Sequence, residues 1–138
     1  MNGTCTLETD RLILRKYKIE DASDMYSNWA TDPLVNRYLS WDNHPNLEFT
    51  KEVIKKWIEE YNDDNTYDWV VELKDTHELI GSINVVHYDK KYSIAEIGYC
   101  YGSKFWGKGY ATEALRKVIE YLLIEEGIYI VEAKHISG

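Results

Sequence analysis

Apolar residues recur along the chain with two different spacings, which predict two kinds of secondary structure. In Leu7–Arg15, Leu12 and Leu14 alternate with charged and apolar neighbours, which predicts a strand of mixed exposure. Ile19–Trp29 has apolar residues at helical spacing on one face, and its first turns carry acidic residues that favour the helix dipole. Leu47–Asn62 predicts a second helix, because its apolar residues follow the i, i+3, i+4, i+7 pattern.

The second half of the chain begins with three strand-like segments separated by short polar turns. Asp68–Lys74, Leu79–Tyr88 and Ser93–Tyr101 predict an antiparallel meander. A long helix is expected over Tyr110–Glu126, and a last strand over Ile128–Ile136. The buried face expected for this helix comprises Ala111, Ala114, Leu115, Val118, Leu122 and Leu123. The residues expected to face water are Glu113, Arg116, Lys117 and Glu120.

The order β-α-α-β-β-β-α-β predicts one α/β (α+β) domain over residues 1–138. A helix between two strands of one sheet normally joins a parallel pair by a right-handed crossover. We therefore expect a mixed, mostly antiparallel sheet with flanking helices, in which the strand before the long helix lies parallel to the last strand.

Charge and composition exclude several classes of protein. The formal net charge is -8 and no run of Lys or Arg occurs, which argues against nucleic-acid binding. No apolar run approaches the about 20 residues of a membrane-spanning helix. The first residues lack the basic and apolar regions of a signal peptide. A cytoplasmic protein with no membrane association is the expectation, and its acidity also suits a cationic substrate such as an amine.

Cysteine and histidine give no sign of a metal site. Cys5 and Cys100 are far apart and form no CxxC pair. The four histidines are scattered, so we expect neither a metal centre nor a catalytic triad.

Three glycines within Gly102–Gly109 separate a predicted strand from the start of the long helix. Glycine lets the backbone approach a phosphate closely, and a helix N-terminus presents free N–H groups and a positive dipole end. This pattern predicts a pyrophosphate site. A P-loop requires Gly-Lys followed by Ser or Thr, and Gly107–Tyr110 lacks it. A dinucleotide fingerprint requires a third glycine where Thr112 stands.

The spacing of Lys104, Gly107 and Gly109 resembles the Q/R-x-x-G-x-G/A pyrophosphate loop of the GNAT superfamily of N-acetyltransferases, with Lys in place of Gln or Arg. The segments AEIGY at Ala95–Tyr99 and WGKGYATEAL at Trp106–Leu115 resemble the branch typified by ribosomal-protein N-terminal acetyltransferases. Three further segments also resemble that branch: TDRLILR at Thr9–Arg15, IEDA at Ile19–Ala22 and TDPLVNRYL at Thr31–Leu39.

The resemblance implies acetyl-CoA as co-substrate, an amine as acceptor and no metal. It places the pantetheine arm against the backbone of Ile97–Tyr101, in a gap between that strand and the last one. The thioester carbonyl would lie near the N–H of Tyr99 or Cys100. The cofactor-binding residues expected on this basis are Ile97, Gly98, Tyr99, Cys100, Lys104, Phe105, Trp106, Gly107, Lys108, Gly109, Tyr110, Ala111 and Thr112.

Glu96 is the candidate general base, because an amine must lose a proton before it attacks a thioester and a carboxylate can accept that proton. A solvated strand carboxylate is the alternative. Trp29, Tyr38 and Trp41 are candidates for the acceptor site, although aromatic clusters are more often core. Cys100 has no nearby histidine in the sequence, so direct transfer in a ternary complex is expected.

Two other functions remain open from the sequence. One is a non-catalytic acyl-CoA-binding module, and the other is a nucleotide-binding enzyme. The family pattern normally continues past the last strand with a further helix and strands, which also help to hold the thiol end of the cofactor. We therefore expect either that the natural protein continues beyond Gly138 or that the chain forms a homodimer through that strand. The identity of the acceptor stays undetermined.

Overall fold

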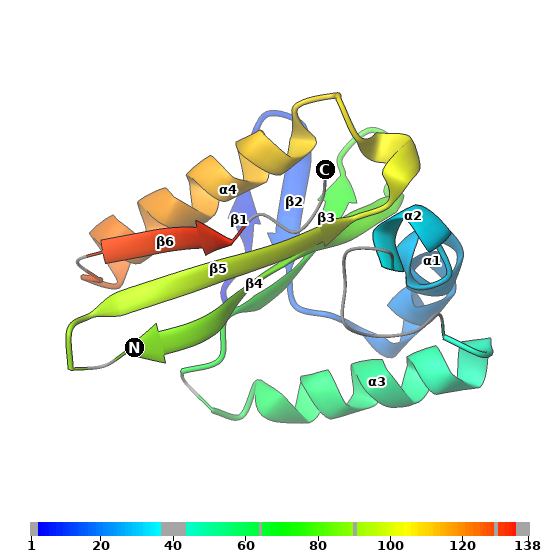
Figure 1. Cartoon of the computed structure of the whole chain (residues 1–138), viewed down its shortest axis with the longest axis horizontal. Helices are drawn as coiled ribbons and strands as arrows, with labels where there is room; N and C mark the ends of the chain where they lie inside the picture. Colours follow the sequence, from blue (N-terminus) through cyan, green and yellow to red (C-terminus); the bar gives the residue numbers. More distant parts are fainter. Residues whose placement is uncertain (1–2, 37–43, 64, 90, 129, 135–138) are drawn as a thin grey trace.

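The structure, a computed structural model, describes residues 3–36, 44–63, 65–89, 91–128 and 130–134. Its strands form one six-stranded sheet in the order β1-β2-β3-β4-β5-β6 (Figure 1). Their bounds are β1 (Leu7–Glu8), β2 (Leu12–Arg15), β3 (Asp68–Leu73), β4 (Leu79–Asp89), β5 (Ile94–Tyr101) and β6 (Ile130–Lys134). Neighbours from β1 to β5 are antiparallel, and β6 is parallel to β5, as the sequence predicted.

The segment predicted as one strand over Leu7–Arg15 is instead a hairpin. Leu7 pairs with Leu14, and the Thr9 N–H donates to the Leu12 carbonyl at 2.9 Å to close the turn. The alternation of Leu12 and Leu14 belongs to β2 alone, so the prediction of a single strand is wrong. The hairpin matters for function because its turn lies against the start of α4.

The helices occupy the predicted segments with some differences in detail. Their bounds are α1 (Ala22–Met25), α2 (Pro33–Asn36), α3 (Leu47–Glu60) and α4 (Tyr110–Glu120). A 3-10 turn precedes α1 and a π turn follows it, so Ile19–Ala30 is one continuous helical segment. The short α2 was not predicted. Another π turn, Tyr121–Glu125, ends α4 and rotates Leu123 outward, so that Leu123 is 40% exposed rather than buried as predicted.

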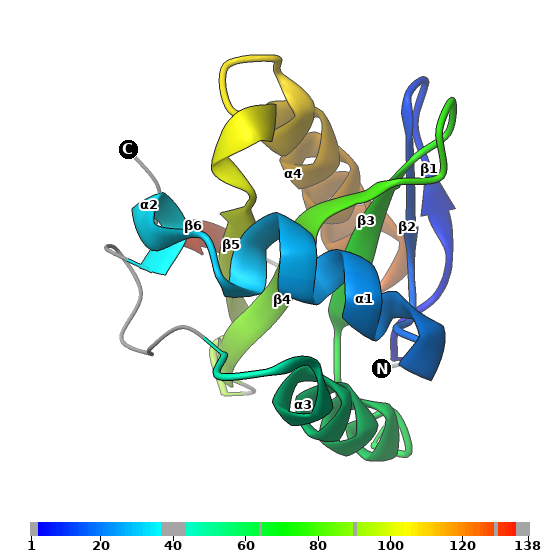
Figure 2. The same cartoon turned by 90° about the vertical axis from the view of Figure 1, so that its right-hand side faces the viewer.

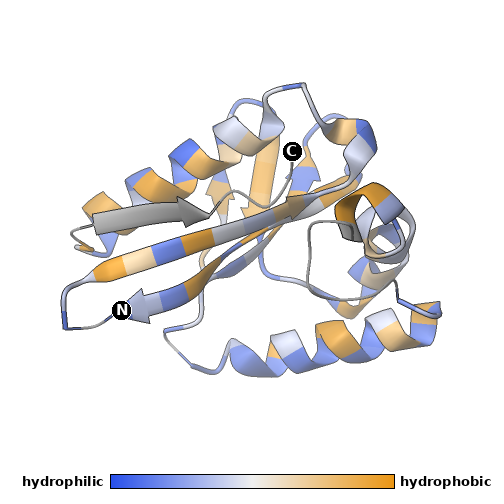
Figure 3. Ribbon diagram, viewed as in Figure 1, coloured by the Kyte–Doolittle hydropathy of each residue, from blue (hydrophilic) through white to orange (hydrophobic). Residues whose placement is uncertain are grey.

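The helices cover both faces of the sheet (Figure 2). On one face, Ala114, Val118 and Leu122 of α4 pack against apolar residues of the strands. On the other face, Met25 and Ile54 from the α1 and α3 segments pack with residues that include Val70 and Leu79. Both α3 and α4 carry hydrophobic and hydrophilic positions in alternation along their length (Figure 3), as expected of helices with one buried side.

The alternation of side chains along β5 fixes which residues face which layer. Ala95, Ile97, Tyr99 and Tyr101 all belong to the core on the α4 side. Because successive strand residues point to opposite faces, Glu96 and Cys100 lie on the face covered by α1 and α3. Consistent with this, Cys100 packs against the core residues on the α1 and α3 side of the sheet.

Candidate functional site

The loop from β5 to α4 ends in a helix N-terminus with available backbone amides. Gly107 and Gly109 have φ angles of 77° and 82°, a left-handed conformation that other residues rarely adopt. Gly109 is the N-cap of α4, and no side chain caps this end of the helix. The N–H groups of the first turn and the positive end of the dipole therefore remain available to an anion.

Hydrogen bonds and close packing hold the start of this loop against β4 and the α1–α2 region. The Gly102 N–H donates to the Ile80 carbonyl at 3.0 Å, and the Ser103 N–H donates to Asp32 Oδ2 at 2.8 Å. A Cβ at Gly102 would lie 2.3 Å from the Asn28 carbonyl oxygen, so this close approach requires glycine. Burial works to raise the pKa of Asp32, but its hydrogen bonds to Ser103 hold that pKa below its usual value. The loop thus starts from a fixed position.

Arg11, from the β1–β2 turn, holds the end of the loop through hydrogen bonds. Arg11 Nη1 donates to the Lys108 carbonyl at 3.1 Å, and Arg11 Nε donates to Glu113 Oε1 at 2.7 Å. The guanidinium also lies over the Tyr110 ring, 4.5 Å from its centroid. The Thr9 hydroxyl donates to the same Glu113 carboxylate. These contacts form a clamp around the first turn of α4.

Sequence reasoning missed this clamp. It assigned Glu113 to the water-facing side of the helix, which is wrong because Glu113 holds the β1–β2 turn. Burial works to raise the pKa of Glu113, but hydrogen bonds from Thr9 and Arg11 hold that pKa below its usual value. No local sequence signal reveals the contact, because Arg11 and Glu113 lie 102 positions apart in the sequence.

The predicted cofactor residues fall into two groups in space. Gly107, Lys108 and Gly109 are exposed at the loop, followed by Tyr110, Ala111 and Thr112 in the first turn of α4. Phe105 is buried in the core on the α4 side, so only its backbone can contact a ligand. The Trp106 indole N–H donates to the Tyr101 carbonyl at 2.9 Å.

Lys104, which is expected to contact the pyrophosphate, forms an ion pair with Glu78. Its ammonium lies 3.1 Å from Glu78 Oε2 and 5.0 Å from the centroid of the Phe105 ring. Its side chain is exposed, so the ion pair is a weak one. A phosphate contact would require the Lys104 ammonium to leave Glu78.

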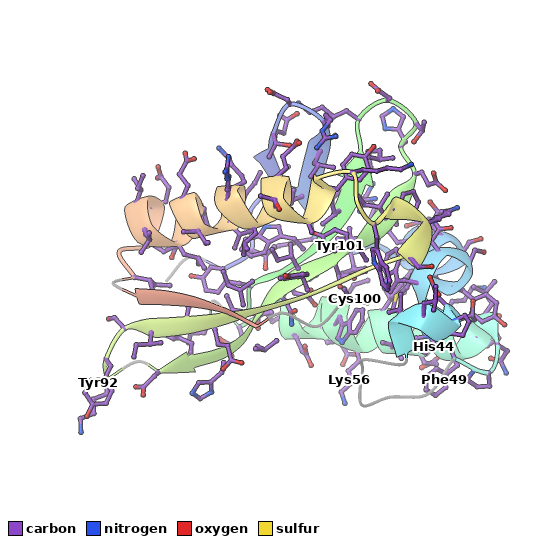
Figure 4. The ribbon with its side chains drawn as sticks, turned by 45° about the horizontal axis from the view of Figure 1, so that its top comes forward. His44, Phe49, Lys56, Tyr92, Cys100 and Tyr101 are labelled. Atoms are coloured by element: carbon purple, nitrogen blue, oxygen red, sulfur yellow. The ribbon has the colours of Figure 1, made fainter. Side chains whose placement is uncertain are left out.

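The pairing of β5 with the described residues of β6 reaches Gly98, three residues before the end of β5. The parallel register runs from Ile94 opposite Ile130 to Gly98 opposite Lys134. Tyr99–Tyr101 continue β5 with described pairing to β4 alone. The backbone of Tyr99–Tyr101 thus follows the part of β5 whose pairing with β6 is described, at the end of β5 that leads into the loop (Figure 4 labels Cys100 and Tyr101 there).

The direction of each amide follows from the ladder. In an antiparallel pair, every second residue directs both its N–H and its C=O to the partner strand. The Gly102 N–H donates to the Ile80 carbonyl of β4, so the backbone groups of Cys100, two residues earlier, also face β4. The backbone groups of Tyr99 and Tyr101 therefore face the opposite side, toward β6. The bond from Trp106 to the Tyr101 carbonyl agrees with this direction. Of the two predicted amides, Tyr99 is the one directed toward the β6 side.

Glu96 lies on β5 within the paired region. It is partly exposed, and its register partners are His87 on β4 and Glu132 on β6. Its side chain belongs to the face of α1 and α3, opposite the helix that carries the loop. A substrate on that face could therefore reach Glu96 without displacing α4.

The remaining candidate residues are the three aromatic residues expected at the acceptor site and Cys100. Trp29 is only 1% exposed and packs in the core, so it does not line an open acceptor surface. Tyr38 and Trp41 lie outside the described residues. Burial, with a contribution from Asp32, raises the pKa of the Cys100 thiol to about 12. A thiol that stays protonated at neutral pH is a poor nucleophile.

Within the part of the chain that the structure describes, no cluster of His, Cys, Asp and Glu side chains is arranged to hold a metal ion. Among its helices, none has both the length and the apolar character needed to cross a membrane.

Comparisons with known proteins identify the family of this chain. A family model described as an acetyltransferase (GNAT) domain matches residues 11–137. The uncharacterized N-acetyltransferase p20 of Bacillus licheniformis is 33% identical over 129 residues, which cover 94% of this chain and 72% of that protein.

Two solved structures share the fold. The ribosomal-protein-S5-alanine acetyltransferase of Vibrio fischeri aligns with a TM-score of 0.68 at 20% identity, over 94% of this chain and 73% of that one. The microcin C7 self-immunity acetyltransferase MccE, in complex with acetyl-CoA and AMP, aligns with a TM-score of 0.70 at 19% identity, over 89% of this chain and 69% of that one. On the family match and the identity to the Bacillus relative, the chain belongs to the GNAT family of acetyltransferases.

Proposed function

We propose that the protein transfers the acetyl group of acetyl-CoA directly to a primary amine in a ternary complex. The observation that carries this proposal is the position of two features at one end of the sheet. The uncapped N-terminus of α4 follows the loop, and the backbone of Tyr99–Tyr101 lies just before it, after the last β5 residue whose pairing with β6 is described. A pyrophosphate and a thioester joined by a pantetheine arm would each find a suitable partner there.

In the proposed site, backbone amides from Gly107 to Thr112 bind the pyrophosphate. Glycine at positions 107 and 109 allows the close approach. The clamp of Arg11 and Glu113 keeps the loop in the binding conformation before the ligand arrives, which lowers the entropy cost of binding.

The reaction needs an amine that has lost its proton. The amine nitrogen attacks the thioester carbonyl, and the developing oxyanion accepts a hydrogen bond from the Tyr99 N–H, which faces the β6 side. The new N–C bond forms, the C–S bond breaks, and CoA leaves as a thiolate that is protonated by solvent. Glu96 accepts the amine proton, directly or through a water molecule.

Acetyl transfer is tested by thiol release. The purified protein is mixed with acetyl-CoA, with and without a panel of primary amines, and free CoA thiol is measured over time. The proposal expects release that depends on the amine. Tight CoA binding without amine-dependent release would instead indicate a non-catalytic acyl-CoA-binding module, and displacement of CoA by ATP or NAD would indicate a nucleotide site.

Gly109→Val is expected to weaken CoA binding at least about tenfold. The φ of 82° is strained for a β-branched residue, and a Cβ there would lie 3.4 Å from the Arg11 guanidinium. Calorimetry with CoA measures the effect. Gly127→Val is the matched control, because Gly127 has a similar φ of 68° at the other end of α4. A folded Gly109→Val protein with wild-type affinity would remove the loop from the site.

Arg11→Met is expected to weaken acetyl-CoA binding about fivefold, because the loop loses one charge-assisted hydrogen bond that is partly exposed to solvent. The KM for acetyl-CoA should rise while kcat changes little. Lys55→Met, an exposed residue of α3, serves as the control for lost surface charge. An unchanged KM in Arg11→Met would mean that the loop keeps its conformation without the clamp.

A further inference from the structure

A groove of about 620 Å³ lies between the β1–β2 turn and the outer side of α4, two elements that are neighbours in Figure 2. The groove begins at Gly109, the N-cap of α4, and continues along the helix past Thr112 and Arg116. Gly109 also belongs to the loop that binds the pyrophosphate in the proposed function. A ligand held at the loop by its pyrophosphate therefore has this groove directly beside it.

Most of the charged side chains that line the groove are already paired. Arg116 is the exception among the cations, because its exposed guanidinium has no hydrogen-bond or ion-pair partner in the described part of the chain. The exposed Asp10 carboxylate, on the turn across the groove, likewise has none there. The groove thus offers one unpaired cation and one unpaired carboxylate to a ligand. The other charged lining residues belong to the pairs Glu8–Lys74 at 3.4 Å, Glu113–Arg11 at 2.7 Å and Glu120–Lys117 at 3.8 Å.

The place of Arg116 on α4 directs its side chain toward the loop. Arg116 follows Thr112 by four residues, so the two exposed side chains are neighbours on the helix surface. Side chains of an α-helix lean toward its N-terminus, so the Arg116 side chain extends over the turn that contains Thr112. At a rise of 1.5 Å per residue, the Arg116 Cα lies about 10 Å along the helix axis from Gly109. An anion bound by Arg116 is therefore a different group from the one at the loop amides.

The chemistry of CoA supplies such a second anion. Besides its pyrophosphate, CoA carries a phosphate on the 3′-oxygen of its ribose, and only that sugar separates the two groups. A guanidinium binds phosphate through two parallel N–H···O bonds, which makes an unpaired arginine a suitable partner. The Asp10 carboxylate repels a phosphate, but it accepts hydrogen bonds from the ribose 2′-hydroxyl or the adenine amino group. An adenosine 3′-phosphate therefore matches both unpaired groups of the groove.

We propose that Arg116 binds the 3′-phosphate of CoA in this groove and that the Thr112 hydroxyl donates a further hydrogen bond to it. This inference rests on the proposed binding of the pyrophosphate at the loop. It makes Arg116 a specificity-determining residue for the acetyl donor. The protein then prefers acetyl-CoA to donors that lack the 3′-phosphate, such as acetyl-3′-dephospho-CoA or an acetylated phosphopantetheine arm on a carrier protein.

The test compares CoA with 3′-dephospho-CoA by calorimetry at low ionic strength. For the wild-type protein, the Kd for CoA should be at least about tenfold lower than that for 3′-dephospho-CoA. The difference should shrink as salt is added, because the guanidinium is exposed. Arg116→Met should raise the Kd for CoA to near that for 3′-dephospho-CoA, with little change for 3′-dephospho-CoA itself. Lys55→Met, an exposed cation of α3 outside the groove, is the matched control.

Arg116→Lys separates the role of the charge from that of the planar guanidinium. It keeps the positive charge but loses the two parallel hydrogen bonds, so its preference for CoA over 3′-dephospho-CoA should fall between those of wild type and Arg116→Met. Equal Kd values for the two ligands in the wild-type protein would overturn the inference while leaving the loop as the pyrophosphate site. Equal weakening of both ligands by Arg116→Met would also overturn it, because the 3′-phosphate would then not be the group that Arg116 binds.

Absence of binding to both ligands would instead count against the proposed function. In that case, calorimetry with adenosine 3′,5′-bisphosphate, set against adenosine 5′-monophosphate, decides the inference alone. Tighter binding of the bisphosphate that is lost in Arg116→Met supports the inference. Absence of any preference for the bisphosphate in the wild-type protein overturns it.

Discussion

Glu96→Gln is expected to lower kcat about 100-fold, because a general base contributes on the order of 10²-fold or more to proton transfer. The amide has nearly the same shape but cannot accept the proton of the amine. Glu96 lies on the face opposite α4, so the loop and its amides should be undisturbed. Calorimetry should therefore give a wild-type affinity for CoA.

The pH dependence gives a second readout for Glu96. The acidic limb of the pH–rate profile should flatten in Glu96→Gln, since the group that must lose its proton is gone. Glu52→Gln, an exposed carboxylate on α3, controls for the lost negative charge. Wild-type turnover of Glu96→Gln at every pH would assign proton removal to another group or to water.

Asp68→Asn is expected to stabilise the folded protein above neutral pH by up to about 4 kcal/mol. Burial raises the pKa of Asp68 from 3.8 to about 7, which corresponds to about 4 kcal/mol at most. The partial exposure of Asp68 to solvent lowers the effect below this bound. The folded state keeps the proton that the unfolded state loses. Ionised Asp68 therefore destabilises the folded wild-type protein, and the neutral amide removes that cost.

The sign of the effect defines its pH window. Between pH 3.8 and about 7 the folded state binds more protons at Asp68, so this group makes wild-type stability fall as pH rises. The difference between Asp68→Asn and wild type should be near zero below pH 3.8 and constant above about 7. Denaturant unfolding in buffers free of amines measures it, with Asp75→Asn as the control. A difference that does not change with pH would mean that Asp68 is not a buried ionisable group.

Strong periodicity made most of the fold predictable from the sequence. The meander from β3 to β5 has short polar turns that permit only antiparallel pairing. The helix between β5 and β6 required the parallel pair that the structure shows. The β1–β2 hairpin was not predicted because β1 has only two residues, too few to show an alternation of apolar and polar side chains.

The glycine loop was also predictable, because local sequence determines it. The left-handed conformations at Gly107 and Gly109 need glycine, and the helix that follows has a clear apolar face. The Arg11 clamp was not predictable, since Arg11 and Glu113 lie 102 positions apart and meet only after the sheet has formed.

The environment of Asp68 was hidden in the sequence for a related reason. Asp68 begins a strand-like segment and reads as an ordinary polar boundary residue. In the folded chain, the Tyr61 hydroxyl accepts from the Tyr17 N–H and donates to the Asp68 carbonyl, so Tyr61 lies against the start of β3. The face on which Glu96 lies, in contrast, followed from simple alternation along β5 once the core on the α4 side was known.

The most direct test of acetyl transfer uses acetyl-CoA labelled with carbon-13 in the acetyl group. The protein is incubated with the labelled co-substrate and a mixture of monoamines and diamines, and each amine is analysed by mass spectrometry. We predict that at least one amine gains a single labelled acetyl group on nitrogen, and that Glu96→Gln greatly slows its formation. A protein that binds CoA but leaves every amine unlabelled would contradict the proposed function.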